Sequence, residues 1–453
     1  MAAADVDLTG EVTELLQALI RNQCVNDGTV ESGGESRNAD VLRQYLQGTG
    51  LALEAYEPAP GRTSLVGRIE GSDPSAPTLC LMGHTDVVPV SPEGWRRDPF
   101  GGELVADEQG AQEVWGRGAI DMLNLTASMA VAFKHLARSG FRPKGSLIYF
   151  AVADEEAGGH HGAGWVTEHQ YDAVRADYVL TESGGVSLPS SSGRRVTVTT
   201  GEKGIAWRRL RVAGTPGHGS MPFGTDNALV KAAEVIRRLV AFRPQAQVTD
   251  TWKAYVGALD LPANIAAGLL DPATVWDTCA GLDDQRLAKL AHACTHMTFS
   301  PNVVHGGVKT NVIPDAVDID VDVRTLPGET EADVARNLTE ALGELSDDVT
   351  VSIIQSAPST ASAMDTPLWD VIGRTVDKLT PGVGLVPRMT AGGTDARFYR
   401  DKGAVAYGFG LFSPSMTFQE FATRFHGHDE RVDVESLRLT TQMWLAVAED
   451  LLG

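Results

Sequence analysis

A histidine and an aspartate two residues apart, His84 and Asp86, follow the apolar run 78–82. Such a run is typical of a buried strand, and on an extended backbone residues two apart point to the same side. The two side chains therefore face one space at a strand end, where open α/β sheets hold their sites. They suit a metal ligand and the carboxylate that orients it. Taken alone, the pair is more typical of a surface ion pair.

Further residues with metal-binding side chains stand in loops after predicted strands or near the C-terminus. The whole set has two imidazoles and three carboxylates: His84, Asp121, Glu156, Glu182 and His426. These donors are expected for zinc or a similar divalent ion. If one carboxylate bridges, the set can hold two ions about 3.5–4 Å apart, as in co-catalytic hydrolases. Any one of these acids alone is more often a cap or a surface charge, but a cluster of them would repel without a cation.

Glu155 and Glu156 are adjacent carboxylates whose side chains should diverge on a loop. One of them can bind a metal ion while the other acts as general base toward a water that the ion has made acidic. An ordinary acidic turn is the alternative interpretation.

The candidate metal ligands can come together only if the strands that precede them end at the same edge of a sheet. Helices are predicted at 8–24, 38–47 and 124–139, and strands at 51–57, 64–70, 78–82, 146–152 and 177–180. Acidic residues follow several of the strands. The alternation of strand, loop and helix predicts an α/β domain with a mainly parallel sheet and helices on both faces.

The pattern changes near residue 200. Strands 204–212 and 317–323 alternate between polar and apolar residues, with helices at 227–240 and 329–345 and a strand at 349–354. Alternation indicates a sheet with one solvated face, so we predict an inserted α+β domain. A helix at 369–379, a strand at 404–409 and a helix at 434–452 return the chain to the first domain. The predicted division is 1–200 and 358–453 for the catalytic domain and 201–357 for the insertion.

The composition limits the classes of partner. The 453 residues carry a net charge of −21, which argues against nucleic acid and anionic membranes. No apolar run approaches the ~18 residues of a membrane helix, and residues 1–7 lack the features of a signal peptide. The four cysteines are far apart without CxxC spacing, which favours free thiols and a cytoplasmic location.

The ordered motifs resemble those of the zinc aminoacylase, carboxypeptidase and deacylase family, which includes acetylornithine deacetylase, succinyl-diaminopimelate desuccinylase and glutamate carboxypeptidase. They run over nearly the whole chain: Gly83–Pro89, Gly116–Met122, Asp154–Gly159, Thr181–Gly184, Gly214–Ser220, Thr310–Pro314, Arg324, Gly392–Asp395 and His426–Glu430. The resemblance implies two Zn²⁺ ions per chain, with Co²⁺ or Mn²⁺ as alternatives.

By this resemblance His84 and Glu182 bind one ion, Glu156 and His426 bind the other, and Asp121 bridges both. The family also has a cis peptide bond after the bridging aspartate, here between Asp121 and Met122.

The resemblance also implies roles around the metals. Asp86 would orient His84, and Glu155 would be the general base. The inserted domain would be a lid through which the chain forms a homodimer, and His218 would cross the dimer to stabilise the oxyanion. Without the resemblance, His218 is an ordinary loop histidine. Four positions match those that hold a substrate carboxylate: Asn311, Arg324, Gly393 and Thr394.

Some features depart from the family pattern or compete with it. Leu123 stands where the family commonly has lysine, and the lid carries extra sequence at about 248–297 that includes Trp252 and Trp276. His428 competes with His426 on spacing, but only His426 precedes an acidic residue by four, as the family's last ligand does. Adjacent His160 and His161 cannot easily reach one ion, and we interpret them as structural.

The sequence thus predicts a dinuclear zinc hydrolase that cleaves an amide bond in a peptide or N-acyl amino acid with a free carboxylate, with a metal-bridging hydroxide as nucleophile. Glu182, rather than Asp, favours the aminoacylase and carboxypeptidase branch. The alternatives are a biosynthetic deacylase of acetylornithine or succinyl-diaminopimelate type and a metal-free relative that only binds such ligands.

Overall fold

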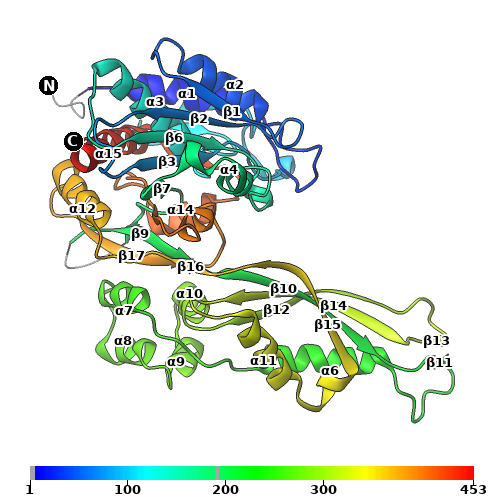
Figure 1. Ribbon diagram of the computed structural model, residues 1–453. Coiled ribbons are helices and arrows are strands. Elements are labelled where there is room, and N and C mark those ends of the chain that lie inside the picture. Colours follow the sequence, from blue (N-terminus) through cyan, green and yellow to red (C-terminus); the bar gives the residue numbers. More distant parts are fainter. Residues whose placement is uncertain (1–5, 189–192) are drawn as a thin grey trace.

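The computed structural model describes residues 6–188 and 193–453, which form two bodies joined by neighbouring strands (Figure 1). Most of the stretch on which we based the absence of a signal peptide, residues 1–5, lies outside the described part. Among the described residues, no helix is both long and apolar enough to cross a membrane. All four cysteines are buried and unpaired, as predicted.

The larger body is built on a sheet whose central strands β6, β3, β7 and β18 run parallel, with antiparallel neighbours toward its edges. In sheet order its strands are β1 (Leu53–Tyr56), β2 (Ser64–Ile69), β6 (Leu147–Val152), β3 (Leu79–His84), β7 (Tyr178–Thr181), β18 (Val405–Gly408), β9 (Arg195–Glu202) and β16 (Thr360–Ala361), with β17 (Gly384–Thr390) and β8 (Ser187–Leu188) also paired to β9. This arrangement confirms the predicted α/β class.

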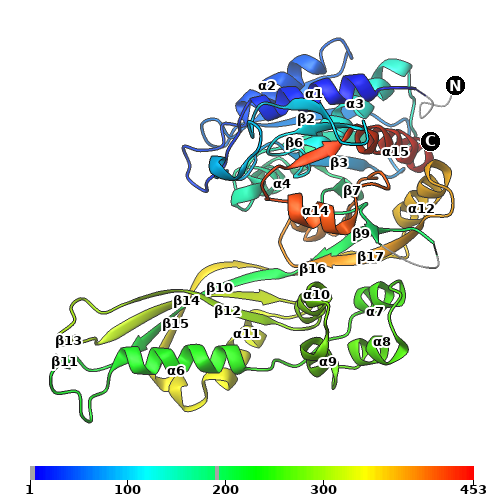
Figure 2. The ribbon, with the colours of Figure 1, turned by 180° about the vertical axis from the view of Figure 1, so that it is seen from behind.

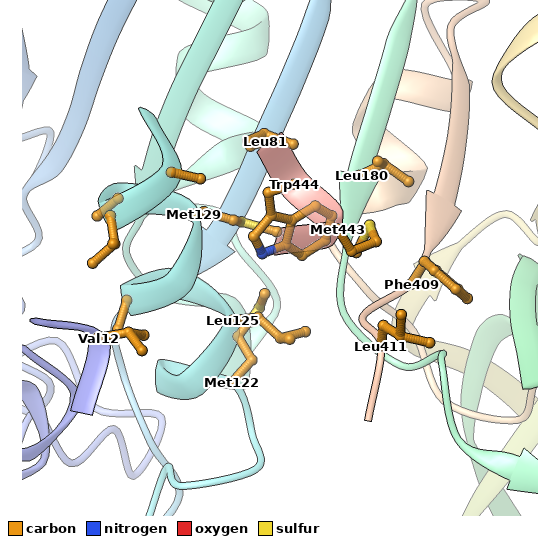
Figure 3. Packing of buried hydrophobic residues seen from close by; sticks show 14 of the residues in the cluster. Val12, Leu81, Met122, Leu125, Met129, Leu180, Phe409, Leu411, Met443 and Trp444 are labelled. Atoms are coloured by element: carbon orange, nitrogen blue, oxygen red, sulfur yellow. The ribbon is translucent and has the colours of Figure 1, made fainter. Parts of the chain in front are cut away.

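Helices cover both faces of this sheet because successive strand side chains alternate between them. On β3, Leu79 and Leu81 belong to one core and Cys80 and Met82 to the other. The first face is covered by α1 (Thr9–Arg21), α2 (Ser36–Tyr45), α3 (Leu123–Ser139), α12 (Pro367–Leu379) and α15 (Val434–Leu452), and the second by α4 (Ala163–His169), α5 (Tyr171–Val174) and α13 (Ala396–Arg400). Figure 3 shows Trp444 of α15 among Met129, Leu81 and Leu180 on the first face.

The smaller body holds an antiparallel sheet of β12 (Thr298–Gly306), β14 (Ala316–Thr325), β10 (Gly204–Ala213) and β15 (Val349–Ala357). Its apolar face packs against α6 (Ala228–Ala241) and α11 (Glu331–Leu342), and alternate residues of β14 are buried, as the sequence pattern predicts. A small ribbon, β11 (Gly217–His218) with β13 (Val312–Ile313), lies at the end of this body farthest from the larger one (Figures 1 and 2).

The extra sequence at 248–297 folds as four short helices: α7 (Asp250–Gly257), α8 (Ala263–Leu270), α9 (Val275–Gly281) and α10 (Gln285–Thr295). They share a core with Val386 and Met389 of β17, so this segment packs beside the large sheet rather than at the tip of the small body (Figure 1).

Several elements were not predicted. The parallel strands β9 and β17 pair with each other at one side of the large sheet. A separate small sheet is formed by β4 (Glu103–Ala106), β5 (Gln112–Trp115) and β19 (Arg431–Asp433), and α14 (Phe418–Arg424) precedes the loop of His426. This small sheet ties the C-terminal segment to the loop before Asp121.

Candidate metal centre

Three adjacent parallel strands end at one place and supply most of the candidate ligands. His84 is the last residue of β3, while Glu182 directly follows β7. A single 3₁₀ turn after β6 carries Glu155 and Glu156. Because β6, β3 and β7 are neighbours in the sheet, their carboxyl ends bring these side chains together.

Asp121 and His426 come from segments far apart in the chain. Hydrogen bonds of Glu430 and Arg117 hold the two segments together. The Glu430 carboxylate accepts backbone N–H bonds from Gly118, Ile120 and Asp121 at 3.1, 2.7 and 3.1 Å, and Arg117 Nη1 donates to it at 2.6 Å. Arg117 Nη2 also donates to the His426 carbonyl at 3.2 Å. The peptide bond between Asp121 and Met122 is cis, as predicted.

The Asp121 carboxylate lies between the two imidazoles, one oxygen to each. His84 Nε2 is 3.2 Å from Asp121 Oδ1, and His426 Nε2 is 2.7 Å from Asp121 Oδ2 and 3.4 Å from Glu156 Oε2. Within the described residues, His84 forms one compact donor group with Asp121 and Glu156 and a second with Glu155 and Glu182. Each oxygen of the Asp121 carboxylate thus faces a different imidazole.

The acids of this cluster repel one another in a buried space. Burial and the charge of Asp121 raise the pKa of Glu156 to about 7. The pKa values of Glu155 and Glu182 are raised well above the usual range, first by burial and then by neighbouring carboxylates. Conversely, although burial favours the neutral imidazole, the bonds to Asp121 and Glu156 raise the pKa of His426 to about 10.

The donor set fits divalent ions. It combines imidazole nitrogens with carboxylate oxygens, the donors that zinc accepts in hydrolases. One buried carboxylate oxygen of this set, Glu156 Oε1, accepts no hydrogen bond from the described residues. A cation would satisfy this oxygen and offset the repulsion among the acids.

Asp86 lies against His84, but its backbone is nearer to the ring than its carboxylate. His84 Nδ1 is 2.9 Å from the Asp86 carbonyl oxygen and 3.6 Å from Asp86 Oδ1. The other oxygen, Oδ2, accepts the Glu156 N–H at 3.1 Å and Asn26 Nδ2 at 2.8 Å. Asp86 therefore orients His84 through its main chain and holds the Glu156 turn through its side chain.

Of the predicted lid residues, His218 and Asn311 are exposed on the ribbon of β11 and β13, away from the metal residues of the same chain (Figure 1). They are neighbours, because the Gly219 N–H donates to the Asn311 carbonyl at 2.9 Å. Arg324, on β14, lies nearer the larger body, since it pairs in register with Ile205 at the start of β10. Its guanidinium donates to Asp322 and stacks 5.7 Å from the Trp207 ring centre.

Thr394 and Gly393 lie where the two bodies join. The Thr394 N–H and hydroxyl both donate to Glu202 Oε2 at 2.7 Å, and a Cβ at Gly393 would lie 3.9 Å from Ile205. The neighbouring Asp395 belongs to the motif Gly392–Asp395, but the sequence predicts no role for it. Both of its carboxylate oxygens are buried without a partner among the described residues, and burial raises its pKa to about 7.

The competing histidines lie elsewhere. The imidazole of His428 packs on Gly94, where a Cβ would come within 2.2 Å of it. His160 is exposed, and the His161 N–H donates to Asp154 Oδ2 at 2.8 Å. None of these three histidines belongs to a metal-binding group of the described residues.

Most of the chain matches one known protein family. The profile of the peptidase family M20/M25/M40 matches residues 80–450. The chain belongs to this peptidase family. It is 27% identical to the N-fatty-acyl-amino acid synthase/hydrolase PM20D1 of Xenopus tropicalis, over 97% of the chain and 86% of that protein. Human aminoacylase-1 is 28% identical over 84% of the chain and 82% of its own length.

A solved structure has the same fold over nearly the whole chain. The M20 family metallo-carboxypeptidase Sso-CP2 from Sulfolobus solfataricus superposes with a TM-score of 0.71 at 14% identity, covering 98% of this chain and 99% of that one. Members of this peptidase family depend on metal ions. The chain is therefore a hydrolase that acts on amide bonds.

Proposed function

We propose that this M20 hydrolase uses two zinc ions to cleave N-acyl amino acids or short peptides that have a free carboxylate. The observation that carries the proposal is the Asp121 carboxylate held between His84 and His426, with Glu156 and Glu182 beside them. The aminoacylase and fatty-acyl-amino acid hydrolase relatives favour an acylated amino acid as the substrate.

Glu155 is the proposed general base. Bound divalent ions would supply Lewis acidity at the scissile carbonyl and acidify a water molecule. The Glu155 carboxylate lies with His84 and Glu182 in the second donor group, so it is within reach of that water. It would take the proton of the water and transfer it to the leaving amine.

The placement of His218 and Asn311 supports a homodimer. Both are exposed at the tip of the smaller body, where they cannot serve the metal centre of their own chain in this arrangement. The same tip exposes the apolar residues Met221, Phe223 and Val308. We propose that residues 201–357 form a lid and dimerisation domain that presents His218 to the partner's site, and that 1–200 and 358–453 form the catalytic domain.

We propose Arg324 as the group that binds the substrate carboxylate, since a guanidinium forms two parallel bonds to a carboxylate. Asp322 now occupies it, with bonds of 2.7 and 3.3 Å. Four buried free thiols support a cytoplasmic location.

The experiment compares N-acyl amino acids of increasing chain length with their carboxamides, using protein stripped by a chelator and then titrated with zinc. We expect activity to return with zinc and the free acids to be preferred about 10–100-fold, the usual worth of a charge-assisted bond. Arg324→Lys should reduce this preference. Equal rates for acids and carboxamides would contradict the proposed substrate class, and a protein that binds no metal would contradict the proposed mechanism.

A further inference from the structure

A buried polar network behind the candidate metal centre joins the N-terminal loop to the turn of Glu155 and Glu156. Its five members are each at most 3% exposed: Asn26, Glu35, Arg62, Asp86 and Asp154. Part of the N-terminal loop, residues 28–35, is rich in glycine and serine. Buried charges are costly unless they are paired, so a network of this kind needs a physical reason.

Glu35 fixes the backbone directly before Glu155. Its Oε1 accepts Arg62 Nη1 at 2.7 Å and the Asp154 N–H at 3.1 Å. Asp154 has φ +69°, a left-handed conformation that residues other than glycine rarely adopt. Such a residue persists only where its surroundings hold it, and here the Glu35 carboxylate does so.

The other side of the turn is held by the same network. Arg62 Nη2 donates to the Thr29 carbonyl at 2.7 Å and to Asn26 Oδ1 at 3.3 Å. Asn26 Nδ2 in turn donates to Asp86 Oδ2, which also accepts the Glu156 N–H. The residues before and after Glu155 are therefore both tied to the N-terminal loop.

Gly33 shows that the loop is shaped around this pair. It has φ +78°, and a Cβ at this position would lie 2.2 Å from Arg62 Nη1 and 2.5 Å from Glu35 Oε2. Only glycine lets the backbone approach the buried ion pair so closely.

We propose that Glu35 and Arg62 are positioning residues, which hold the Glu155–Glu156 turn so that one carboxylate faces the substrate water and the other the metal. This inference rests on the proposed role of Glu155. A misplacement of about 1 Å in a catalytic group lowers the rate by about 100-fold.

The first test replaces the ion pair by apolar side chains of similar size, Glu35→Leu with Arg62→Met. Replacing both partners of a buried pair is often tolerated, so the variant should fold, with a lowered melting temperature because Asp154 loses its acceptor and its ion-pair partner. We expect kcat to fall about 100-fold with KM changed less than about two-fold. Arg208→Met is the control, because it removes a buried arginine of the lid that pairs with Glu331.

Two single variants distinguish the effect of the length of the Glu35 side chain from the effect of its charge. Glu35→Gln keeps an oxygen that can accept the Asp154 N–H, whereas Glu35→Asp keeps the charge but is one methylene shorter. We expect Glu35→Gln to retain most of kcat and Glu35→Asp to lose most of it. The opposite order would overturn the proposal, and it can be measured even if the double variant does not fold.

Hydrogen exchange gives a readout that does not depend on activity. In the double variant the peptide covering residues 150–160 should exchange faster than in the wild-type protein, while the lid remains unchanged. Faster exchange with wild-type kcat, or lowered kcat with unchanged exchange, would each overturn the proposal. A failure of the proposed function is distinguishable, since Glu155→Ala would then keep its turnover whatever the exchange result.

Discussion

Most side chains of the candidate metal centre are buried, with His426 as the exposed exception, whereas those of the lid tip are exposed. Asp121 is 3% exposed and His84 is 1% exposed, each within a set of short hydrogen bonds. His218 is exposed on a two-residue strand, where its Nδ1 accepts the Ser220 N–H at 3.2 Å and lies 2.8 Å from the Ser220 hydroxyl. The residues of the first site come together within one chain, whereas the proposed role of His218 requires the site of a partner chain.

The largest effect is expected at the metal centre. Glu155→Ala should lower kcat by about 10³-fold, within the range for loss of a general base, because the other carboxylate of the turn, Glu156, is the proposed metal ligand. Metal content should be unchanged. A variant with wild-type kcat would contradict the role of Glu155, and Glu14→Ala on the exposed face of α1 serves as control.

His218→Ala should lower kcat by about 100-fold, as for loss of an oxyanion donor. The comparison between the two regions predicts that the histidine acts across the dimer. Mixing His218→Ala chains with Glu155→Ala chains should then restore about a quarter of wild-type activity, because half of the dimers carry one intact site. No recovery after mixing would place His218 in the site of its own chain or outside catalysis.

Strand order explains which metal-centre residues were predictable. His84, Glu156 and Glu182 follow apolar strands that become neighbours, so their meeting follows from the α/β pattern. Asp121 and His426 depend on the bonds of Glu430 and Arg117 across about 310 residues, for which spacing offers no rule, and here the family resemblance supplied the prediction.

The missed features have equally physical causes. Pro387 lies within β17, and proline weakens the sequence pattern of a strand, but β17 pairs with β9 at one side of the sheet, where proline is tolerated. Glu35 and Arg62 were missed because their contacts connect an irregular loop to a distant turn. Only the glycine content of that loop, with Gly33 against the ion pair, was a signal.

A buried lysine between β9 and β10, where the larger and smaller bodies join, predicts that stability depends on pH. Burial lowers the pKa of Lys203 to about 8, and its Nζ donates to the His296 carbonyl at 2.7 Å. Between pH 8 and about 10.4 the unfolded chain binds more protons at this residue, so the free energy of unfolding should rise with pH, by about 3 kcal/mol. Denaturant unfolding of the wild-type protein and of Lys203→Met at several pH values in this range measures the free energy of unfolding. If this free energy changes with pH equally in both proteins, the effect of Lys203 is contradicted.

The smallest effect is expected for Asp86→Ala. The His84 ring keeps its bond to the backbone carbonyl of residue 86, so the variant loses the more distant carboxylate and the bonds that it accepts from the Glu156 N–H and Asn26 Nδ2. We expect zinc affinity to fall about 10-fold, the lower end for such supporting residues. Competition with a chelating dye measures it, and loss of all bound zinc would mean that Asp86 is itself a ligand.

The central claim is that Asp121 bridges two ions. The most direct measurement is the anomalous scattering at the zinc edge from crystals grown with zinc. We predict two peaks about 3.5–4 Å apart, one beside His84 and Glu182 and one beside Glu156 and His426, with Asp121 between them. A single peak, or peaks away from Asp121, would contradict it.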